Sequence, residues 1–520
     1  MLESGSPGHP VDTAGDPHAG PWRSALYPQD WTPGFTVEVD DGGPPAGLPD
    51  FSYAGYGGGG VPLPEARSDG ALDVLDHGAD PTGVADSMAA MQSAIDAAAA
   101  AGGGVVWVPA GDYRLDGGLR ITTSGVVLAG EGPDRSRLSF TAPGPADQAS
   151  LQLAGTLDLG DARPLLQDAS AGDTVVQLAD VDGLAPGDPV GLGVVITDAF
   201  VTEHGMEGYW TFAQGERRTI FQRTVVAVEG DRVTLDVPLR YALRTRDAAD
   251  LRVERGHLTE CGVVGLALSS AVDWDAAWDV DRHHVLGLDR VADCVVRDVQ
   301  SWPGLAGDGE HHLQSGGLIV SRSRRVTVAD TTLERAQNRG GGGNGYLFEL
   351  RQSDEVLVRD SIGRAGRHNF IQNWDFGTTG CVFLRTLSEG GQAWSGKGGS
   401  GVTTGLSEFH HALAMANLVD DSVAHDGWGA VNRLMWSSGA GHTATEGVFW
   451  NVRGEGQLAS LQYGRGYVIG TEGLDVRTEV TEVYDSSGTA PEDWVEGLGE
   501  AATLEPRSLY EDQLARRLGR

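Results

Sequence analysis

Short apolar runs recur along the second half of the chain and constrain its fold more than any other sequence feature. The runs are CVVRD, VTVAD, VLVRD, VFLRT, NLVDD and VFWNV, ending at Asp298, Asp330, Asp360, Thr386, Asp421 and Val452, at steps of 26 to 35 residues. Between them fall five further strand-like runs: GGLIVS, NGYLFEL, RHNFIQNW, WGAVNRLMW and LASLQYG. Each interval has room for two or three short strands with their turns, which is typical of one coil of a solenoid. Equivalent residues of successive coils would then stack at the ~4.8 Å spacing of paired strands.

A second pattern precedes the repeat, in residues 73–132. Residues 87–101 are rich in alanine and predict a helix, with Asp86 as its N-cap and Gly102 as the first residue of the stop. The runs VVWVP, YRL, GLRI and VVLAG then predict short strands separated by glycine turns.

The order DHGADPTGVADSMAAMQSAIDAAAAAGGGVVWVPAGDYRL in this window resembles the opening of the pectate-lyase-like superfamily of right-handed parallel β-helices. In that superfamily an Asp-x-Gly-Ala-x-x-x-Gly-x-x-Asp segment leads into a capping helix. A Gly-Gly-x-V-x-x-P-x-G-x-Y strand then begins the first coil. The resemblance is specific for the fold, but lyases, hydrolases, epimerases and phage tailspikes share it.

The repeat and the resemblance together predict an all-β chain, a right-handed parallel β-helix over residues 66–500 with an N-terminal capping helix. Residues 1–65 are expected to form an irregular extension that aromatic side chains pin to the solenoid. A small β insertion is expected at about 145–250, where hairpin-like runs break the repeat. Its segment MEGYWTFAQGERR could reach over a groove. Residues 501–520 carry leucines at helical spacing, which predicts a helical tail that packs on the solenoid.

The charge balance limits the class of partner. The 520 residues carry 38 basic and 73 acidic side chains, a formal net charge of −35, which disfavours a nucleic acid held by phosphate contacts. No apolar run approaches the ~20 residues of a membrane span. The resemblance implies an extracellular or periplasmic protein, although the sequence begins without the basic and apolar regions of a signal peptide. The oligomeric state stays open.

The resemblance implies an enzyme that degrades a polysaccharide or oligosaccharide in a groove along the solenoid, and we favour a lyase that cleaves a uronate-containing glycan by β-elimination. The expected catalytic residues are Glu349, Arg364, Arg367, His368 and Tyr346. The arginines would bind and neutralise the uronate carboxylate. His368 or Arg367 would take the α-proton, and Glu349 or Tyr346 would protonate the leaving oxygen. We expect the apolar neighbours of Glu349 to raise its pKa.

Other residues of the middle coils are candidate substrate ligands: Arg385, Trp374, Asn373, Asn432, Arg433, His425 and Lys397. Arg385 would share the carboxylate with the other arginines, and Trp374 could stack on a sugar ring. Lys397 is the only lysine in the chain, which suggests a role for its amine.

Calcium is the one cofactor that the resemblance suggests, with Glu334 and Glu389 as candidate ligands. The compact Asp cluster of the best-known pectate lyases is not evident, which weakens the case for both calcium and pectate. The pair His410-His411 is not expected to form a metal site, since adjacent side chains of a strand point to opposite faces.

Two other functions stay open. A glycoside hydrolase would pair Glu349 with Glu334, Glu389 or Asp375, because that reaction requires two carboxyl groups. The Asn-Thr-Asp and Gly-His-Gly motifs of the polygalacturonase branch are absent from the sequence. The second alternative is a glycan-binding or tailspike-like β-helix protein without catalytic activity.

Overall fold

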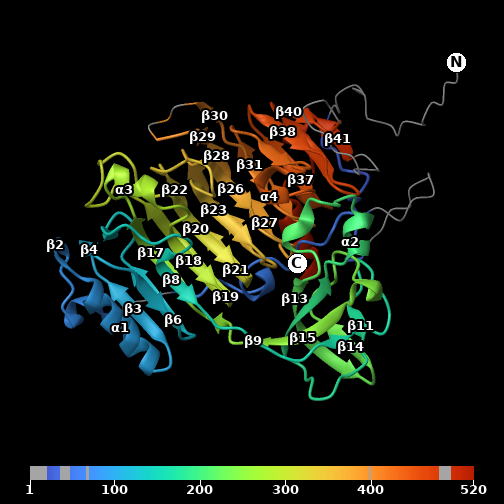
Figure 1. The fold of residues 1–520 in the computed structure, drawn as a ribbon, viewed down its shortest axis with the longest axis horizontal. Coiled ribbons are helices and arrows are strands. Elements are labelled where there is room, and N and C mark those ends of the chain that lie inside the picture. The colour runs from blue at the N-terminus through green and yellow to red at the C-terminus, as the bar shows by residue number, and fades with distance from the viewer. Residues whose placement is uncertain (1–19, 35–46, 66–68, 398, 400, 480–492) are drawn as a thin grey trace.

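The fold is a long parallel β-solenoid with a smaller β unit attached to its side (Figure 1). A computed structural model describes residues 20–34, 47–65, 69–397, 399, 401–479 and 493–520. Parallel strands form a 20-stranded sheet and a 10-stranded sheet, and apolar side chains from both sheets share one core. The predicted parallel β-helix is therefore confirmed.

The strands of the solenoid are short and closely spaced. The 20-stranded sheet contains β1 (Leu72–Asp73), β2 (Thr82–Asp86), β3 (Gly104–Val108), β4 (Gly111–Leu115), β6 (Val126–Gly130), β7 (Ser136–Phe140), β16 (Leu258–Thr259), β17 (Gly262–Ser269), β19 (Val291–Ser301), β21 (Arg324–Ala329), β22 (Thr332–Glu334), β24 (Leu357–Arg359), β25 (Ile362–Arg364), β27 (Val382–Leu384), β28 (Leu387–Glu389), β33 (Leu418–Asp420), β34 (Val423–Ala424), β37 (Val448–Arg453), β39 (Tyr467–Glu472) and β41 (Trp494–Leu498). The 10-stranded sheet runs in the order β5 (Leu119–Ile121), β8 (Ala149–Ala154), β18 (His284–Asp289), β20 (Gly316–Ser321), β23 (Tyr346–Arg351), β26 (His368–Gln372), β31 (Ser407–Phe409), β35 (Trp428–Ala430), β38 (Gln457–Ser460) and β40 (Asp475–Arg477).

The remaining elements are short pairs of strands and a few helices. The strand pairs are β29 (Gln392–Trp394) with β30 (Val402–Thr404) and β32 (Ala414–Met415) with β36 (Ala444–Thr445). The α-helices are α1 (Met88–Ala100), α2 (Asp198–Glu203), α3 (Trp274–Asp279), α4 (Trp436–Gly439) and α5 (Leu509–Arg517). Among the described helices, none has the length and apolar character needed to cross a lipid bilayer.

Left-handed residues at the ends of the apolar runs accompany the repeat seen in the sequence. The backbone bends at Asp330 between β21 and β22, at Asp360 between β24 and β25, and at Asp421 between β33 and β34, with φ between 44° and 51°. Aspartate adopts this conformation more readily than most residues. In the run that ends at Thr386, the left-handed residue lies one position earlier, at Arg385 (φ 48°).

The ten-stranded sheet turns one face to the core and carries polar side chains on the other. On the core side, the rings of Phe348 and Phe370 stack with centroids 4.8 Å apart. Glu349 of β23 pairs in register with Ile371 of β26, and Ile371 pairs with Glu408 of β31. Two carboxylates therefore lie in one column, two strands apart, or about 9–10 Å between their backbones.

The predicted capping helix is confirmed as α1, within one residue at each end. Met91 and Ile95 pack into the solenoid core. The N-cap is Ser87 rather than the predicted Asp86, although Asp86 accepts a hydrogen bond from the backbone N–H of Met88 at 3.0 Å.

The two ends of the chain pack together on the outside of the 20-stranded sheet. Phe51 and Tyr510 belong to one apolar cluster with Trp450 of that sheet. Tyr27 Oη donates to Asp512 Oδ2 of α5 at 2.6 Å. The described part of the N-terminal segment and α5 therefore cover the sheet on the side away from the ten-stranded sheet.

The smaller β unit is a separate seven-stranded sheet. Its strands are β9 (Asp158–Leu159), β10 (Arg163–Pro164), β11 (Val175–Gln177), β12 (Pro189–Val195), β13 (Arg217–Glu229), β14 (Arg232–Leu235) and β15 (Asp250–Arg255). A buried ion pair joins it to the solenoid, because Arg223 Nη1 of β13 lies 2.7 Å from Asp354 Oδ2. Trp210 reaches the solenoid as well, donating from Nε1 to the Ala440 carbonyl at 2.9 Å.

Candidate active site

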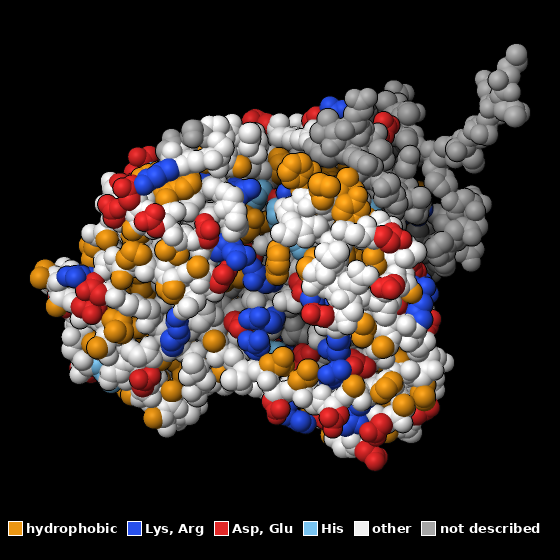
Figure 2. Space-filling view, in the orientation of Figure 1, with side chains coloured by type: hydrophobic (Ala, Val, Ile, Leu, Met, Phe, Trp, Pro, Cys, Tyr) orange, Lys and Arg blue, Asp and Glu red, His pale blue; other side chains and the backbone are white. Residues whose placement is uncertain are grey.

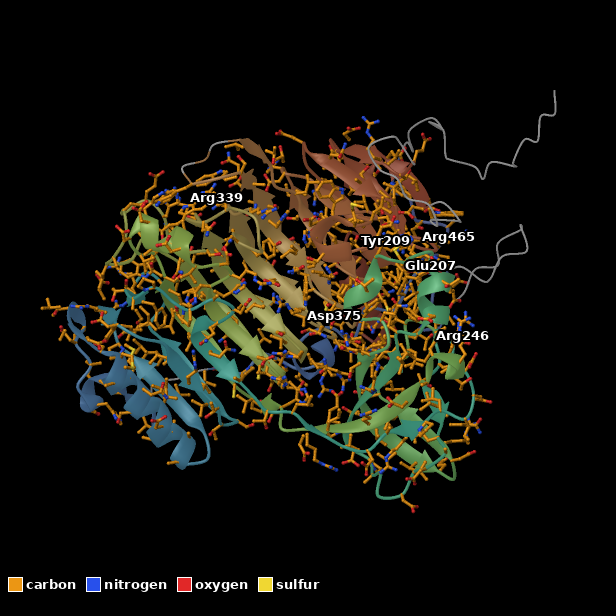
Figure 3. All side chains as sticks on the ribbon, in the orientation of Figure 1. Glu207, Tyr209, Arg246, Arg339, Asp375 and Arg465 are labelled. Carbon is orange, nitrogen blue, oxygen red and sulfur yellow. The ribbon has the colours of Figure 1, made fainter. Side chains whose placement is uncertain are left out.

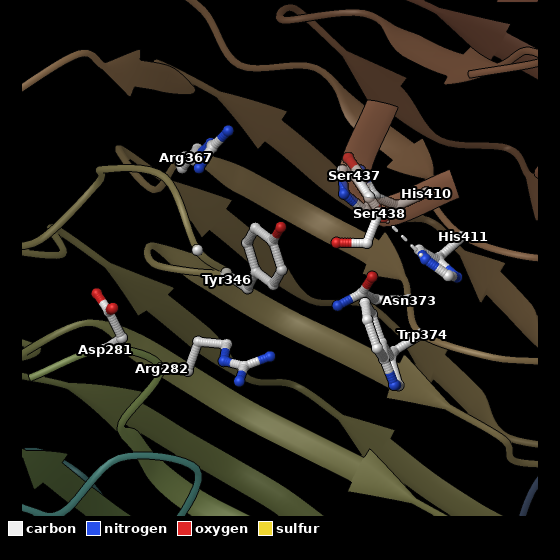
Figure 4. A pocket seen from close by; sticks show the side chains of 12 residues that line it. Asp281, Arg282, Tyr346, Arg367, Asn373, Trp374, His410, His411, Ser437 and Ser438 are labelled. Carbon is white, nitrogen blue, oxygen red and sulfur yellow. Dashed lines mark hydrogen bonds between the residues drawn. The ribbon is translucent and has the colours of Figure 1, made fainter. Parts of the chain in front are cut away.

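A cavity of about 470 Å³ opens beside the ten-stranded sheet (Figure 4). Its charged and ring-bearing lining residues are Asp281, Arg282, Tyr346, Arg367, Trp374, His410 and His411. They come from the segment after α3, from β23, and from the residues that flank β26 and β31. Figure 2 shows Lys and Arg side chains around the hollow in the middle of this face.

The charged side chains that line the cavity are mostly positive, whereas the whole chain is strongly negative. Among the described lining residues there are two arginines and one carboxylate, whereas the chain has a net charge of −35. The carboxylate of Asp281 is also hydrogen-bonded, since its Oδ1 accepts a hydrogen bond from Asn344 Nδ2 at 2.6 Å. A local cluster of positive side chains in a concave site favours an anionic ligand.

A buried carboxylate orients His410. Its Nδ1 donates to Glu408 Oε1 at 2.6 Å, and Glu408 Oε2 accepts from Arg433 Nη1 at 2.8 Å. Burial alone would raise the pKa of Glu408, but the adjacent imidazoles and Arg433 hold this pKa well below its usual range. Because the Nδ1 proton is directed at the carboxylate, neutral His410 has an unprotonated Nε2. That nitrogen can accept a proton.

His368 has a different arrangement. Its Nδ1 donates to the Leu406 carbonyl at 2.5 Å, and burial lowers the pKa of His368 to about 4. Its Nε2 lies 3.2 Å from Glu408 Oε1 without a hydrogen-bond partner among the described residues. His410 lines the cavity and His368 does not, although the sequence pointed to His368 as the candidate base.

Tyr346 lies between the two arginines of the cavity (Figure 4). Its ring centroid is 5.2 Å from that of His368 and 6.1 Å from that of His410. Burial raises the pKa of Tyr346 well above its usual value, so the phenol keeps its proton at neutral pH. A protonated hydroxyl therefore lies beside the histidine that can accept a proton.

Glu349 is an ionised carboxylate held by hydrogen bonds, and the prediction that its pKa would be raised is wrong. Its Oε1 accepts from Asn373 Nδ2 at 3.0 Å and Arg351 Nη2 at 3.2 Å, and its Oε2 lies 3.1 Å from His284 Nε2. Burial would raise the pKa of Glu349, but these partners outweigh it and lower the pKa to about 2. Arg351 lies two residues away on the same strand, but His284 and Asn373 come from other coils, and the local sequence does not show them beside Glu349.

Glu349→Gln should lower stability in a pH-dependent way. A carboxyl group with a depressed folded pKa stabilises the fold fully above its unfolded pKa, and the stabilisation disappears as pH falls through the folded value. The difference between a pKa of about 2 in the folded state and the ordinary pKa of 4.5 corresponds to roughly 3 kcal/mol at neutral pH. Urea unfolding at pH 7 and pH 3 should show a large loss at pH 7 and a smaller loss at pH 3. An equal loss at both would contradict the assignment.

An aromatic wall closes one side of the cavity. The ring centroids of Trp374 and His411 are 4.4 Å apart, and Phe212 from the inserted unit lies 4.8 Å from His411. Burial lowers the pKa of His411 to about 3, and its Nε2 donates to the Ser437 carbonyl at 3.0 Å. His410 and His411 both line the cavity because they follow the end of β31. Their predicted orientation to opposite faces is wrong.

Arg367 is the predicted arginine that lies in the cavity. Its guanidinium contacts the Gly340 carbonyl, and its buried Nε has no hydrogen-bond partner among the described residues. Arg282, at the rim, pairs with exposed Asp147 at 2.9 Å. Asn373 lines the cavity as well and donates to Glu349.

Three predicted residues form a surface ladder outside the cavity. Glu334 of β22, Arg364 of β25 and Glu389 of β28 are paired in register. Arg364 forms an ion pair with Glu389, and its Nη1 lies 3.8 Å from Glu334 Oε2. The guanidinium of Arg364 therefore lies between the two carboxylates, and the calcium site at Glu334 and Glu389 stays a prediction.

The other predicted ligands lie away from the cavity lining. Arg385 binds Asp360 and, through Nη1 at 2.7 Å, Glu511 of α5. Lys397 forms an ion pair with Asp275. The remaining three differ in environment: His425 is exposed, Asn432 is buried in the turn before α4, and Arg433 supports Glu408.

The sequence did not lead us to predict Arg282 or Glu408 as site residues, nor the role of His410. Glu408 and His410 lie two residues apart in SEFHH, and residues at that spacing on a strand share a face. This spacing could have revealed the carboxylate–histidine pair. Arg282 follows α3, and nothing in the local sequence marks it as a cavity residue.

Comparisons with known proteins agree with the fold. A family model described as rhamnogalacturonase A/epimerase, pectate lyase-like, matches residues 71–152. The mannuronan C5-epimerase AlgE6 of Azotobacter vinelandii is 34% identical over 154 residues, which covers 26% of this chain and 17% of that protein. Alginate lyase 7 of the same organism is 44% identical over 56 residues, 11% of this chain and 6% of that protein. These stretches are a small part of the relatives' own length.

A solved structure extends the likeness over most of the chain. It is the Gp54 tailspike of Acinetobacter baumannii bacteriophage AP22, in complex with a capsular saccharide of that bacterium. The alignment has a TM-score of 0.50 at 12% identity and covers 79% of this chain and 59% of the tailspike. A pectate-lyase-like family model thus matches the N-terminal segment of the chain, and the alignment with the tailspike agrees with its parallel β-helix fold.

Proposed function

We propose that the protein is a polysaccharide lyase that removes the C5 proton of a uronate residue and cleaves the glycan by β-elimination. The observation that carries this proposal is the placement of His410, held by Glu408, beside protonated Tyr346 in an arginine-lined cavity. The superfamily contains carbohydrate-active enzymes, and a polymeric substrate would place the reaction outside the cytoplasm.

The arginines would make the C5 proton removable. Arg367 lines the cavity, and Arg282 lies on the opposite side of Tyr346 (Figure 4). A guanidinium bound to the uronate carboxylate stabilises the negative charge that develops when the neighbouring C–H bond breaks. In this step, arginine side chains of the protein itself neutralise the uronate carboxylate.

His410 and Tyr346 would carry the two protons of the reaction. His410 Nε2 accepts the C5 proton, and the Glu408 carboxylate stabilises the imidazolium that forms. The C5–H and C4–O bonds break, a C4=C5 double bond forms, and the Tyr346 hydroxyl gives its proton to the departing oxygen. The ring centroids of the two residues are 6.1 Å apart, close enough for both to contact one sugar residue.

A two-carboxylate hydrolase fits this cavity less well. Such an enzyme needs a carboxylic acid with a raised pKa to protonate the leaving group. Glu349 and Glu408 both have lowered pKa values because donors surround them. Asp375, the other candidate partner, is bound by Arg218 Nε at 2.7 Å.

C5 epimerisation is a second candidate, because several of the curated relatives are mannuronan C5-epimerases. That reaction begins with the same proton removal but returns a proton to the opposite face of the sugar. The product analysis described below distinguishes epimerisation from elimination.

The test is incubation with a panel of uronate-containing polymers, in chelator and in added calcium. A rise in ultraviolet absorbance from the unsaturated uronate, together with new reducing ends, is the expected result. A change in uronate configuration without unsaturation would show epimerisation instead. New reducing ends without unsaturation would indicate a hydrolase. Binding in a glycan array without any product would support a non-catalytic protein.

Arg367→Ala should lower kcat/KM on the responsive polymer by about 10²–10³-fold, because it removes a donor aimed at developing charge. Arg364→Ala is the matched control. Arg364 lies three residues away in the sequence but pairs with Glu389 outside the cavity. We expect the control to retain wild-type kinetics. Equal losses in the two variants would contradict the assignment of Arg367 to the site.

A further inference from the structure

We propose that His368, Glu408 and His410 form a binding site for one divalent transition-metal ion of the zinc class at the base of the cavity. All three residues are buried, and each offers a ligand atom that lies within 4.8 Å of the other two. Two imidazoles and a carboxylate form a common ligand set for zinc. The three ligands come from β26, β31 and the residue after β31, so the paired strands hold them in place.

The distances suit a small tetrahedral ion. Two ligands at the usual ~2.0–2.1 Å from zinc lie ~3.4 Å apart when the coordination is tetrahedral. His368 Nε2 lies 3.2 Å from Glu408 Oε1, and His410 Nδ1 lies 2.6 Å from the same oxygen. Only modest movement of the side chains would bring all three atoms to these ligand distances. The side open to the cavity leaves room for a water molecule or a substrate oxygen as the fourth ligand.

The hydrogen bonds of His368 point to a missing cation. A backbone carbonyl only accepts, so the contact with Leu406 at 2.5 Å fixes the proton of His368 on Nδ1. Nε2 of the neutral ring then turns a lone pair toward a carboxylate oxygen, and it has no hydrogen-bond partner among the described residues. Two acceptors in contact require a positive species between them.

The surrounding residues match the outer partners of a metal site. Arg433 Nη1 donates to Glu408 Oε2 at 2.8 Å, which leaves Oε1 for the ion and fixes the carboxylate plane. The Leu406 carbonyl fixes the ring of His368 in the same way. Such partners orient ligands and raise affinity. Calcium prefers oxygen ligands alone, so the two imidazoles discriminate against it.

Occupancy of the site would stop the proposed proton transfer, a consequence that rests on the proposed function. The metal takes Nδ1 of His410, and the proton of the neutral ring moves to Nε2. That nitrogen then donates and no longer accepts the C5 proton. Zinc is therefore expected to inhibit the lyase reaction, and a chelator is expected to restore it.

The direct test needs no substrate. The full chain is dialysed against zinc alone, bound metal is counted by elemental analysis, and cobalt serves as a spectroscopic probe of tetrahedral coordination. We expect one ion per chain and losses in affinity above ~100-fold for His368→Ala, Glu408→Gln and His410→Gln, because even outer-partner changes cost 10–100-fold. His411→Ala, next to a ligand but outside the cluster, should bind normally. Thermal melting shows which variants remain folded.

Two results would overturn the inference: no zinc bound by the wild-type chain, or zinc bound equally by the folded ligand variants. The result is separable from the proposed function. Zinc binding by a chain that acts on no uronate polymer refutes only the lyase, and lyase activity in a chain that binds no zinc refutes only the metal site.

Discussion

His410→Ala is expected to lower kcat on the responsive uronate polymer by about 10²–10⁴-fold, the usual contribution of a general base. KM should change little, because the arginines that bind the carboxylate remain. The physical reason is the hydrogen bond from His410 Nδ1 to Glu408, which leaves Nε2 as the proton acceptor in the cavity. Steady-state kinetics on the purified variant give both constants.

Two further variants separate catalysis from structural damage. Glu408→Gln removes the charge that stabilises the imidazolium, so it should lower kcat less than His410→Ala and shift the pH dependence of kcat. His425→Ala replaces an exposed histidine and should behave as wild type. Near wild-type kcat in His410→Ala would refute its role as the base.

Arg223→Ala should reduce the free energy of unfolding by about 3–5 kcal/mol, the usual cost of leaving a buried charge without its partner. Arg223 is 1% exposed and its Nη1 lies 2.7 Å from Asp354 Oδ2. Glu355 Oε1, the next carboxylate, is 3.8 Å from the same nitrogen. The substitution would therefore weaken the connection between the inserted unit and the solenoid.

Urea unfolding of Arg223→Ala and of Arg477→Ala measures this effect against a matched control. Arg477 pairs with Asp475 at 3.0 Å, but both side chains are more than half exposed. An exposed pair of this kind contributes ~1 kcal/mol or less. Equal losses in the two variants would show that the buried pair does not stabilise the junction.

The solenoid was predictable because each coil repeats the same local pattern. An apolar strand followed by a residue that tolerates the left-handed conformation recurs at Asp330, Asp360 and Asp421, and the α1 segment precedes the first coils. The repeat alone does not determine which residue of each run lies at the bend, and so it does not determine the register of the paired strands. The bend lies at Arg385 rather than Thr386, and a one-residue slip moves every following side chain to the other face.

The cavity was only partly predictable because its residues meet through the pairing of coils of unequal length. β26 pairs with β31 across an excursion that contains β29 and β30, and this pairing brings His368 next to Glu408. Counting positions from the strand ends could not reveal this contact. The same counting placed Arg364 with Arg367, although one lies in a surface ladder and the other in the cavity.

The central claim is that this cavity removes the C5 proton of a uronate, and a polymer labelled with deuterium at C5 tests it most directly. Incubation with the wild-type chain should release the label to solvent as product forms, with a primary isotope effect on the rate. His410→Ala should release almost none. Cleavage of the polymer by the wild-type chain with the C5 label fully retained would contradict the account.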